Sequence, residues 1–144
     1  MRAVIFFLVL VFAAGCKPKD STSTVSPRLV ADQTDSSQLT TIEWKESSIN
    51  YGKITEGQKL EVSFHFKNTG TKPLVIKKVV PGCGCTIAET PSEPISPGEE
   101  GVIKATFDSR NRVGTQHKTI FVDANTSGKQ QHELVFEVEV GKSG

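Results

Sequence analysis

Apolar and polar residues alternate along most of the chain after residue 41. A period of two is typical of strands that bury one face, and no window shows a convincing helical period. The pattern therefore predicts about seven short strands. Their apolar positions are Ile42 and Trp44; Ile49 and Tyr51; Val62, Phe64 and Phe66; Leu74 and Ile76; Ile103, Ala105 and Phe107; Ile120 and Val122; and Leu134, Phe136, Val138 and Val140.

Turn-forming residues separate these runs. Pro97-Gly98 fits the two central positions of a type II turn, because proline presets φ and glycine accepts a positive φ. Asn68-Thr69-Gly70 supplies residues that tolerate positive φ, and residues 111–114 and 125–128 have similar chemistry. Short strands separated by turns predict an all-β, immunoglobulin-like β-sandwich of about seven strands over residues 42–141.

The N-terminus is typical of an export signal. Arg2 precedes an apolar run from Ala3 to Ala14, which at about 12 residues is shorter than the roughly 20 of a spanning helix. The run ends in Ala13-Ala14-Gly15-Cys16, which resembles a lipobox with Ala where Leu is usual. We expect a signal peptide over 1–15 and a diacylated Cys16, the alternative being ordinary cleavage that leaves a free thiol. Lys17, rather than Asp, favours the outer membrane by resemblance to sorted lipoproteins.

Residues 16–41 are predicted to be the lipidated N-terminus and a flexible linker. They are rich in Ser, Thr, Asp and Gln and have no apolar period, so they cannot bury enough surface to offset the entropy of ordering. The alternative is a strand hidden within residues 27–31.

Several motifs together resemble the domain-of-unknown-function 1573 family over roughly residues 42–140. In chain order they are Tyr51-Gly52, Asn68-Thr69-Gly70, Pro73-Leu74-Val75-Ile76, Cys83-Gly84-Cys85-Thr86, Pro94-Ile95-Ser96-Pro97-Gly98 and the stretch from Gly114 to Asn125. The resemblance implies an exported protein, often a lipoprotein, with a fold of the ASH/PapD-like branch of immunoglobulin sandwiches. It implies no activity.

Composition adds few functional clues. A formal net charge of +1 gives no reason to expect nucleic acid as a partner, and no catalytic triad, phosphate loop or carboxylate pair stands out. Cys83-Gly84-Cys85 is the sharpest motif. Three interpretations stay open: a short disulfide or packed structural turn, a redox-active thiol pair, and two ligands for a soft metal such as copper or zinc.

Strand parity also predicts a candidate binding surface. Val75, Phe121 and Val135 should point away from the core on three strands that share a sheet, so together they could form an apolar outer patch. We therefore expect a non-enzymatic, membrane-anchored module without a cofactor that binds a protein or envelope component. It should be held in the periplasm or at the cell surface. The alternative is a thiol-redox or soft-metal site at Cys83 and Cys85.

Overall fold

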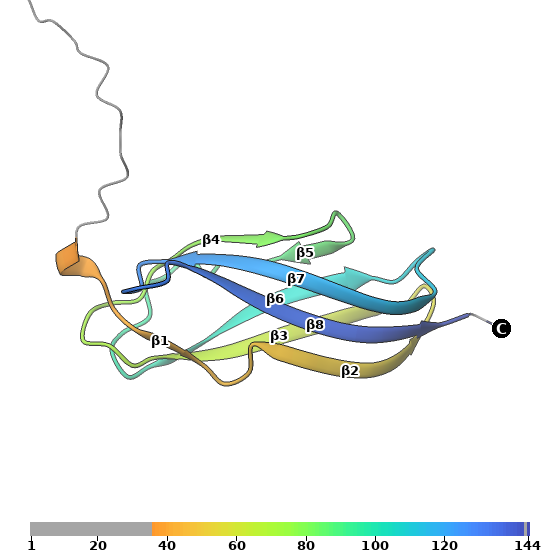
Figure 1. Cartoon of the computed structure of the whole chain (residues 1–144), viewed down its shortest axis with the longest axis horizontal. Coiled ribbons are helices and arrows are strands. Elements are labelled where there is room, and N and C mark those ends of the chain that lie inside the picture. The colour runs from red at the N-terminus through yellow and green to blue at the C-terminus, as the bar shows by residue number, and fades with distance from the viewer. Residues whose placement is uncertain (1–35, 143) are drawn as a thin grey trace, which may run out of the picture. The chain divides into compact units, whose positions relative to one another are not determined.

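Eight strands form two four-stranded sheets in the computed structural model, which describes residues 36–142 and 144 (Figure 1). The expected signal peptide, Cys16 and the linker up to residue 35 lie outside the described residues. Sheet one has the order β1 (Ile42–Trp44), β3 (Lys59–Asn68), β6 (Glu100–Asp108) and β5 (Thr86–Ala88). Sheet two has the order β2 (Ser48–Thr55), β8 (Gln131–Gly141), β7 (Gly114–Ala124) and β4 (Ile76–Pro81).

The predicted all-β sandwich is confirmed, with eight strands rather than about seven. The additional strand is β5, where the polar Thr86 is buried and the apolar Ile87 is exposed, the reverse of the pattern that identified the other strands. A short 3₁₀ helix, η1 (Ser36–Gln38), precedes β1.

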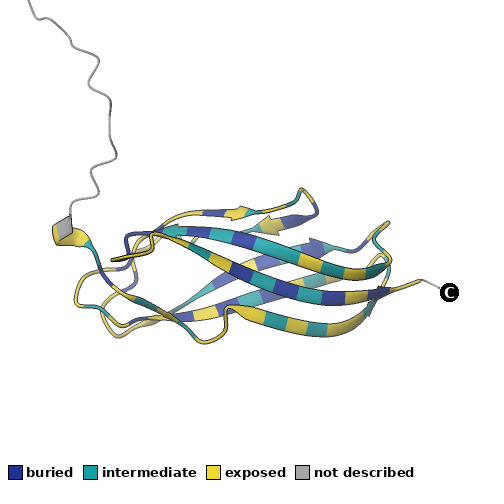
Figure 2. Cartoon of the chain, viewed as in Figure 1, coloured by how far each residue is buried: buried dark blue, intermediate teal, exposed yellow. Residues whose placement is uncertain are grey.

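The core lies between the two sheets, where buried and exposed positions alternate along the strands (Figure 2). Phe64 and Phe66 of β3 are fully buried, as are Phe107 of β6 and Phe136 of β8. Phe107 and Phe136 come from opposite sheets, and their ring centroids are 5.8 Å apart. Apolar side chains from both inner faces thus fill one continuous layer, as is usual for a β-sandwich.

The chain changes sheets between β1 and β2. β1 pairs antiparallel with β3, whereas β2 pairs parallel with β8 in the other sheet. Because β1 is short, it pairs only with the last three residues of β3. Tyr51 of β2 reaches the part of this edge that β1 leaves uncovered, where its hydroxyl accepts a hydrogen bond of 3.0 Å from the Ser63 N–H. The tyrosine satisfies a strand-edge donor that would otherwise need water.

Two buried asparagines hold one end of the sandwich together. Asn68, at the end of β3, accepts hydrogen bonds from the Thr40 hydroxyl (2.9 Å) and the Gly70 N–H (3.1 Å). It also donates to the carbonyls of Lys72 (2.8 Å) and Ile95 (2.9 Å). At the same end, Asn125 donates through its amide to the carbonyls of Gln38 and Pro73.

The structure extends the domain beyond its predicted N-terminal boundary. We expected a flexible linker up to residue 41, but Thr40 is buried and its N–H donates to the Asn125 carbonyl at 3.0 Å. The linker therefore ends before Thr40, because this residue is hydrogen-bonded both to the Asn68 side chain and to the Asn125 backbone. A single buried threonine carries no periodic signal that could have revealed this.

The turn predictions had mixed outcomes. Gly98 has a φ of 82°, and the Glu99 N–H donates to the Ser96 carbonyl at 3.0 Å, so the predicted Pro97-Gly98 turn is confirmed. The interpretation of Asn68-Thr69-Gly70 as a positive-φ turn was wrong, since Gly70 is not among the positive-φ glycines. Glycine is needed there for space, because a Cβ would lie 2.6 Å from the Thr41 nitrogen.

Candidate functional site

The Cys83–Cys85 disulfide lies in the turn that carries the chain from sheet two to sheet one. Its Cα atoms are 5.3 Å apart, closer than the roughly 6.6 Å of two alternate residues in an extended strand. The approach arises because the chain turns here, and the Thr86 N–H donates to the Cys83 carbonyl at 3.3 Å. β4 ends just before the motif and β5 begins just after it.

Neighbouring strands fix both ends of this turn. The Gly82 N–H donates to the Thr119 carbonyl of β7 at 2.8 Å. The Asp108 N–H at the end of β6 donates to the Cys85 carbonyl at 2.9 Å. The disulfide is therefore attached to one strand of each sheet, and its position depends on backbone contacts rather than on the sulfur bridge alone.

The two sulfurs have different surroundings. Cys85 is 7% exposed and belongs to the buried core, whereas Cys83 is only partly buried. The Thr86 hydroxyl lies 3.7 Å from the Cys83 Sγ and 3.9 Å from the Cys85 Sγ. Access from solvent is thus greater at Cys83.

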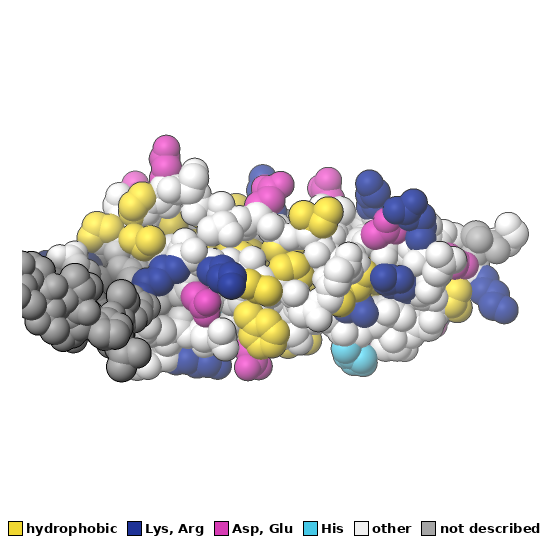
Figure 3. Space-filling model, turned by 90° about the horizontal axis from the view of Figure 1, so that it is seen from above, with side chains coloured by type: hydrophobic (Ala, Val, Ile, Leu, Met, Phe, Trp, Pro, Cys, Tyr) yellow, Lys and Arg dark blue, Asp and Glu magenta, His cyan; other side chains and the backbone are white. Residues whose placement is uncertain are grey.

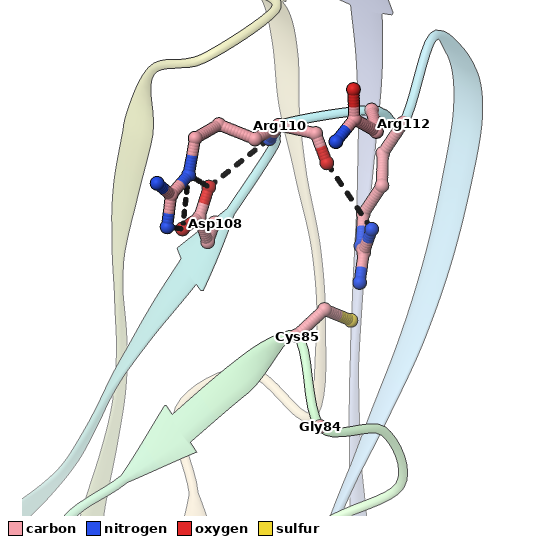
Figure 4. A pocket seen from close by; sticks show the side chains of 6 residues that line it. Gly84, Cys85, Asp108, Arg110 and Arg112 are labelled. Atoms are coloured by element: carbon pink, nitrogen blue, oxygen red, sulfur yellow. Dashed lines mark hydrogen bonds and ion pairs between the residues drawn. The ribbon is translucent and has the colours of Figure 1, made fainter.

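A hollow of about 350 Å³ lies on the Cys85 side of the disulfide, lined by Gly84, Cys85, Asp108, Arg110, Asn111 and Arg112. Figure 4 shows the Arg112 side chain extending down toward the Cys85 sulfur. Its guanidinium also donates to the Arg110 carbonyl at 3.2 Å. Asn111, between the two arginines, has a φ of 58°, so the backbone turns sharply there and the Arg110 and Arg112 side chains leave the loop in different directions.

Arg110 has a different role from Arg112 in the same hollow. Its Nε donates to both carboxylate oxygens of Asp108, at 3.0 Å to Oδ1 and 2.9 Å to Oδ2, and its Nη2 donates to Oδ2 at 2.5 Å. These hydrogen bonds and the guanidinium charge hold the pKa of Asp108 at about 2. Figure 4 shows this ion pair on the far side of the loop from Arg112.

A second hollow of about 350 Å³ lies on the Cys83 side, lined by Gly82, Cys83, His117, Lys118, Thr119 and Phe121. Phe121 of β7 is directly opposite Val80 of β4 in the strand register. Val135 of β8 is opposite Thr119, one step diagonally from Phe121. We call Val80, Phe121 and Val135 the apolar strip; it lies on the outer face of sheet two beside the disulfide.

The structure does not bring all three predicted surface residues together. β4, β7 and β8 share sheet two, and Phe121 and Val135 are diagonal neighbours. Val75 instead pairs with Asn125 just before β4, where its N–H donates to the Asn125 side chain at 2.7 Å. Asn125 follows Phe121 by four residues, so Val75 lies about 13 Å from Phe121 along the strand direction.

Val80 is the surface residue that sequence reasoning missed. A register shift between Ile76 and Lys78 changes which residues of β4 face outward, so Val79 is buried and Val80 is 36% exposed. A β-bulge reverses the parity of every residue after it. The apolar run Val79-Val80 alone gives no sign of where the bulge lies.

Figure 3 looks onto the side of the domain where β4 and β5 lie at the top of Figure 1. Apolar side chains form a broken band along the middle, and basic side chains lie beside it toward both ends. Within residues 36–142 and 144, no three of the His, Cys, Asp and Glu side chains are close enough to hold a metal ion. No helix in this described part is long and apolar enough to cross a membrane.

The two-sheet topology makes this domain an immunoglobulin-like sandwich of the PapD/ASH-like type. The family model described as "Protein of unknown function (DUF1573)" matches residues 42–140. The chain therefore belongs to the DUF1573 family, as its motifs indicated. No curated protein is similar enough to count as a relative.

Solved structures share the fold at low identity. A Porphyromonas gingivalis W83 protein of unknown function has a TM-score of 0.62 at 15% identity, covering 72% of this chain and 48% of that one. The match therefore spans about half of that protein. PapD-like domain 7 of human CEP192 has a TM-score of 0.51 at 15% identity, covering 94% and 98%. The YadV chaperone has a TM-score of 0.52 at 18% identity, covering 72% and 54%.

Proposed function

We propose that this protein is a non-enzymatic, lipid-anchored module that binds another exported protein through the apolar strip. The observation that carries the proposal is the direct pairing of Val80 with Phe121 on an outer sheet face, with Val135 diagonal to them. Apolar side chains that adjoin one another on a surface are more informative than scattered ones. The hollow beside Phe121 would accept a protruding side chain of the partner.

Acidic residues around the strip define the chemistry of the partner. Glu133 is opposite Phe121 in the register, and Glu137 and Glu139 follow on the same face of β8. His117 contacts Glu137 at 3.0 Å and Lys53 contacts Glu139 at 3.3 Å, whereas no ion pair involving Glu133 is observed within the described part of the chain. We therefore propose a protein partner whose apolar side chain is flanked by lysine or arginine.

The anchor and the location belong to the same proposal. Small residues before Cys16 support diacylation of that cysteine, and acyl chains contribute about 0.8 kcal/mol per buried CH₂ to membrane binding. Lys17 supports the outer membrane. The domain would then act in the periplasm or at the cell surface.

Site-specific photocrosslinking in the cells that make the protein tests the proposal. A photoreactive residue at Val135 should give one discrete protein adduct, whereas the same residue at Val102 should not, because Val102 belongs to β6 in the other sheet. Phe121→Asp should abolish the adduct while the melting temperature stays nearly unchanged. Raising the salt concentration should weaken the adduct, since the proposed partner is basic.

Equal adducts from Val135 and Val102 would overturn the proposal, because they would report the crowded envelope rather than a docking surface. A large fall in melting temperature for Phe121→Asp would also contradict it, by placing that ring in the core.

A further inference from the structure

We infer that the Cys83–Cys85 disulfide is a thiol–disulfide exchange site, at which a dithiol of another exported protein attacks Cys83 and Cys85 is the leaving sulfur. This activity goes beyond docking at the apolar strip and does not depend on it. The geometry that points to it is the asymmetry between the two sulfurs and the position of Arg112.

The accessible sulfur is the one that a thiolate can attack. Exchange proceeds through a mixed disulfide on the attacked sulfur, so access decides which sulfur that is. Each cysteine lines a hollow of about 350 Å³, but the hollow beside Cys85 is lined by two arginines and Cys85 as a residue is 7% exposed, whereas Cys83 is only partly buried. An incoming thiolate therefore reaches the Cys83 Sγ and displaces the Cys85 Sγ.

Arg112 is placed to stabilise the sulfur that leaves. Figure 4 shows its side chain directed toward the Cys85 sulfur, and a nearby guanidinium favours a thiolate. Arg110 lines the same hollow, but its guanidinium is paired with both carboxylate oxygens of Asp108. The two arginines thus form a matched pair in which only one faces the disulfide.

Opening the disulfide would leave the fold in place. The ring encloses only Gly84, so the bond contributes little by restricting the unfolded chain. The backbone hydrogen bonds from Gly82 to Thr119 and from Asp108 to Cys85 hold the turn without it. A bond that is accessible at one sulfur and contributes little to stability is suited to repeated opening and closing.

The exchange balances with a dithiol as the reductant. One partner thiolate attacks the Cys83 Sγ, the Cys83–Cys85 bond breaks, and Cys85 leaves as a thiolate. The second partner thiolate then attacks the mixed disulfide and releases Cys83. The partner dithiol becomes a disulfide, and its two electrons and two protons end on Cys83 and Cys85 as thiols.

Reduction of the full-length protein with small thiols tests this inference without any protein partner. With glutathione as the probe and rapid alkylation to trap intermediates, mass spectrometry should find glutathione on Cys83 and alkylation on Cys85. Glutathione on Cys85, or equally on both, would overturn the proposed direction of attack.

A second measurement tests the role of Arg112. With dithiothreitol as the reductant, Arg112→Gln should slow reduction about threefold, the change expected from a roughly tenfold loss of leaving-group acidity. The matched control Arg110→Gln should leave the rate nearly unchanged. Equal rates for the two variants would refute the role of Arg112, and reduction only under denaturing conditions would refute the exchange site itself.

Discussion

Replacing Asn68 by alanine removes the side chain that joins three segments at one end of the sandwich: the residues before β1, the loop after β3 and the segment around Ile95. Asn68 is fully buried and makes four side-chain hydrogen bonds, to Thr40, Gly70, Lys72 and Ile95. The Ile95 carbonyl keeps a partner in the variant, because it also accepts from the Leu74 N–H at 2.9 Å.

The cost follows from the groups that lose a partner. The Thr40 hydroxyl is buried, so the loss of its acceptor costs about 1–3 kcal/mol. The Gly70 N–H and the Lys72 carbonyl lie nearer to water, so the loss of each of their hydrogen bonds costs about 0.5–1.5 kcal/mol. Some cavity energy adds to this. We expect Asn68→Ala to lower the free energy of unfolding by about 3–5 kcal/mol, a large part of the roughly 5–15 kcal/mol of a typical domain.

Urea denaturation followed by the fluorescence of Trp44, the only tryptophan, measures this change. Asn50→Ala is the matched control. Asn50 is exposed, and its side chain makes two hydrogen bonds, to Glu137 and from Gly52. We expect that variant to lose about 1 kcal/mol or less. Similar losses in the two variants would refute the assignment of Asn68 as the buried junction.

Three further predictions follow from other parts of the chain. Gly101→Ala should lose about 1–3 kcal/mol, because its Cβ would lie within 2.8 Å of the buried Phe66 ring; Gly141→Ala, which meets only ordinary contacts, is the control in the same urea titration. Burial, and to a smaller extent a nearby lysine, holds the pKa of His132 below its usual 6.5. The unfolded chain therefore binds more protons at this histidine than the folded chain does, so the free energy of unfolding should fall as the pH drops below about 6.5. His132→Gln should reduce this pH dependence, measured as the urea midpoint. Cys16→Ser should abolish acyl labelling and release the protein from the membrane fraction; unchanged labelling would place the lipid elsewhere.

The alternating pattern was sufficient to predict the sandwich and most of its core. Val62, Phe64 and Phe66 face inward without interruption along β3, as do the four apolar residues of β8 from Leu134 to Val140. In a strand that buries one face, every second residue points into the core, so an alternating sequence shows which residues are buried. Fold class was predictable because long strands repeat this signal many times.

The candidate site was less predictable, because it depends on features without a period. The bulge in β4 exposes Val80, and only the register with β7 reveals it. The different directions of Arg110 and Arg112 depend on the positive φ of Asn111 between them. The spacing of Cys83 and Cys85 left a disulfide, free thiols and a metal site open, since the turn geometry that brings their Cα atoms to 5.3 Å is not encoded in the spacing.

The parallel pairing of β2 with β8 determines how the domain would respond to mechanical load. β2 follows the N-terminal strand β1, and β8 is the last strand before the C-terminus. When β2 and the end of β8 are pulled apart, these parallel strands slide along each other, so the force loads their hydrogen bonds together rather than one after another. Antiparallel terminal strands would instead open from one end, bond by bond. The β2–β8 pair would therefore withstand a load that separates antiparallel strands one hydrogen bond at a time.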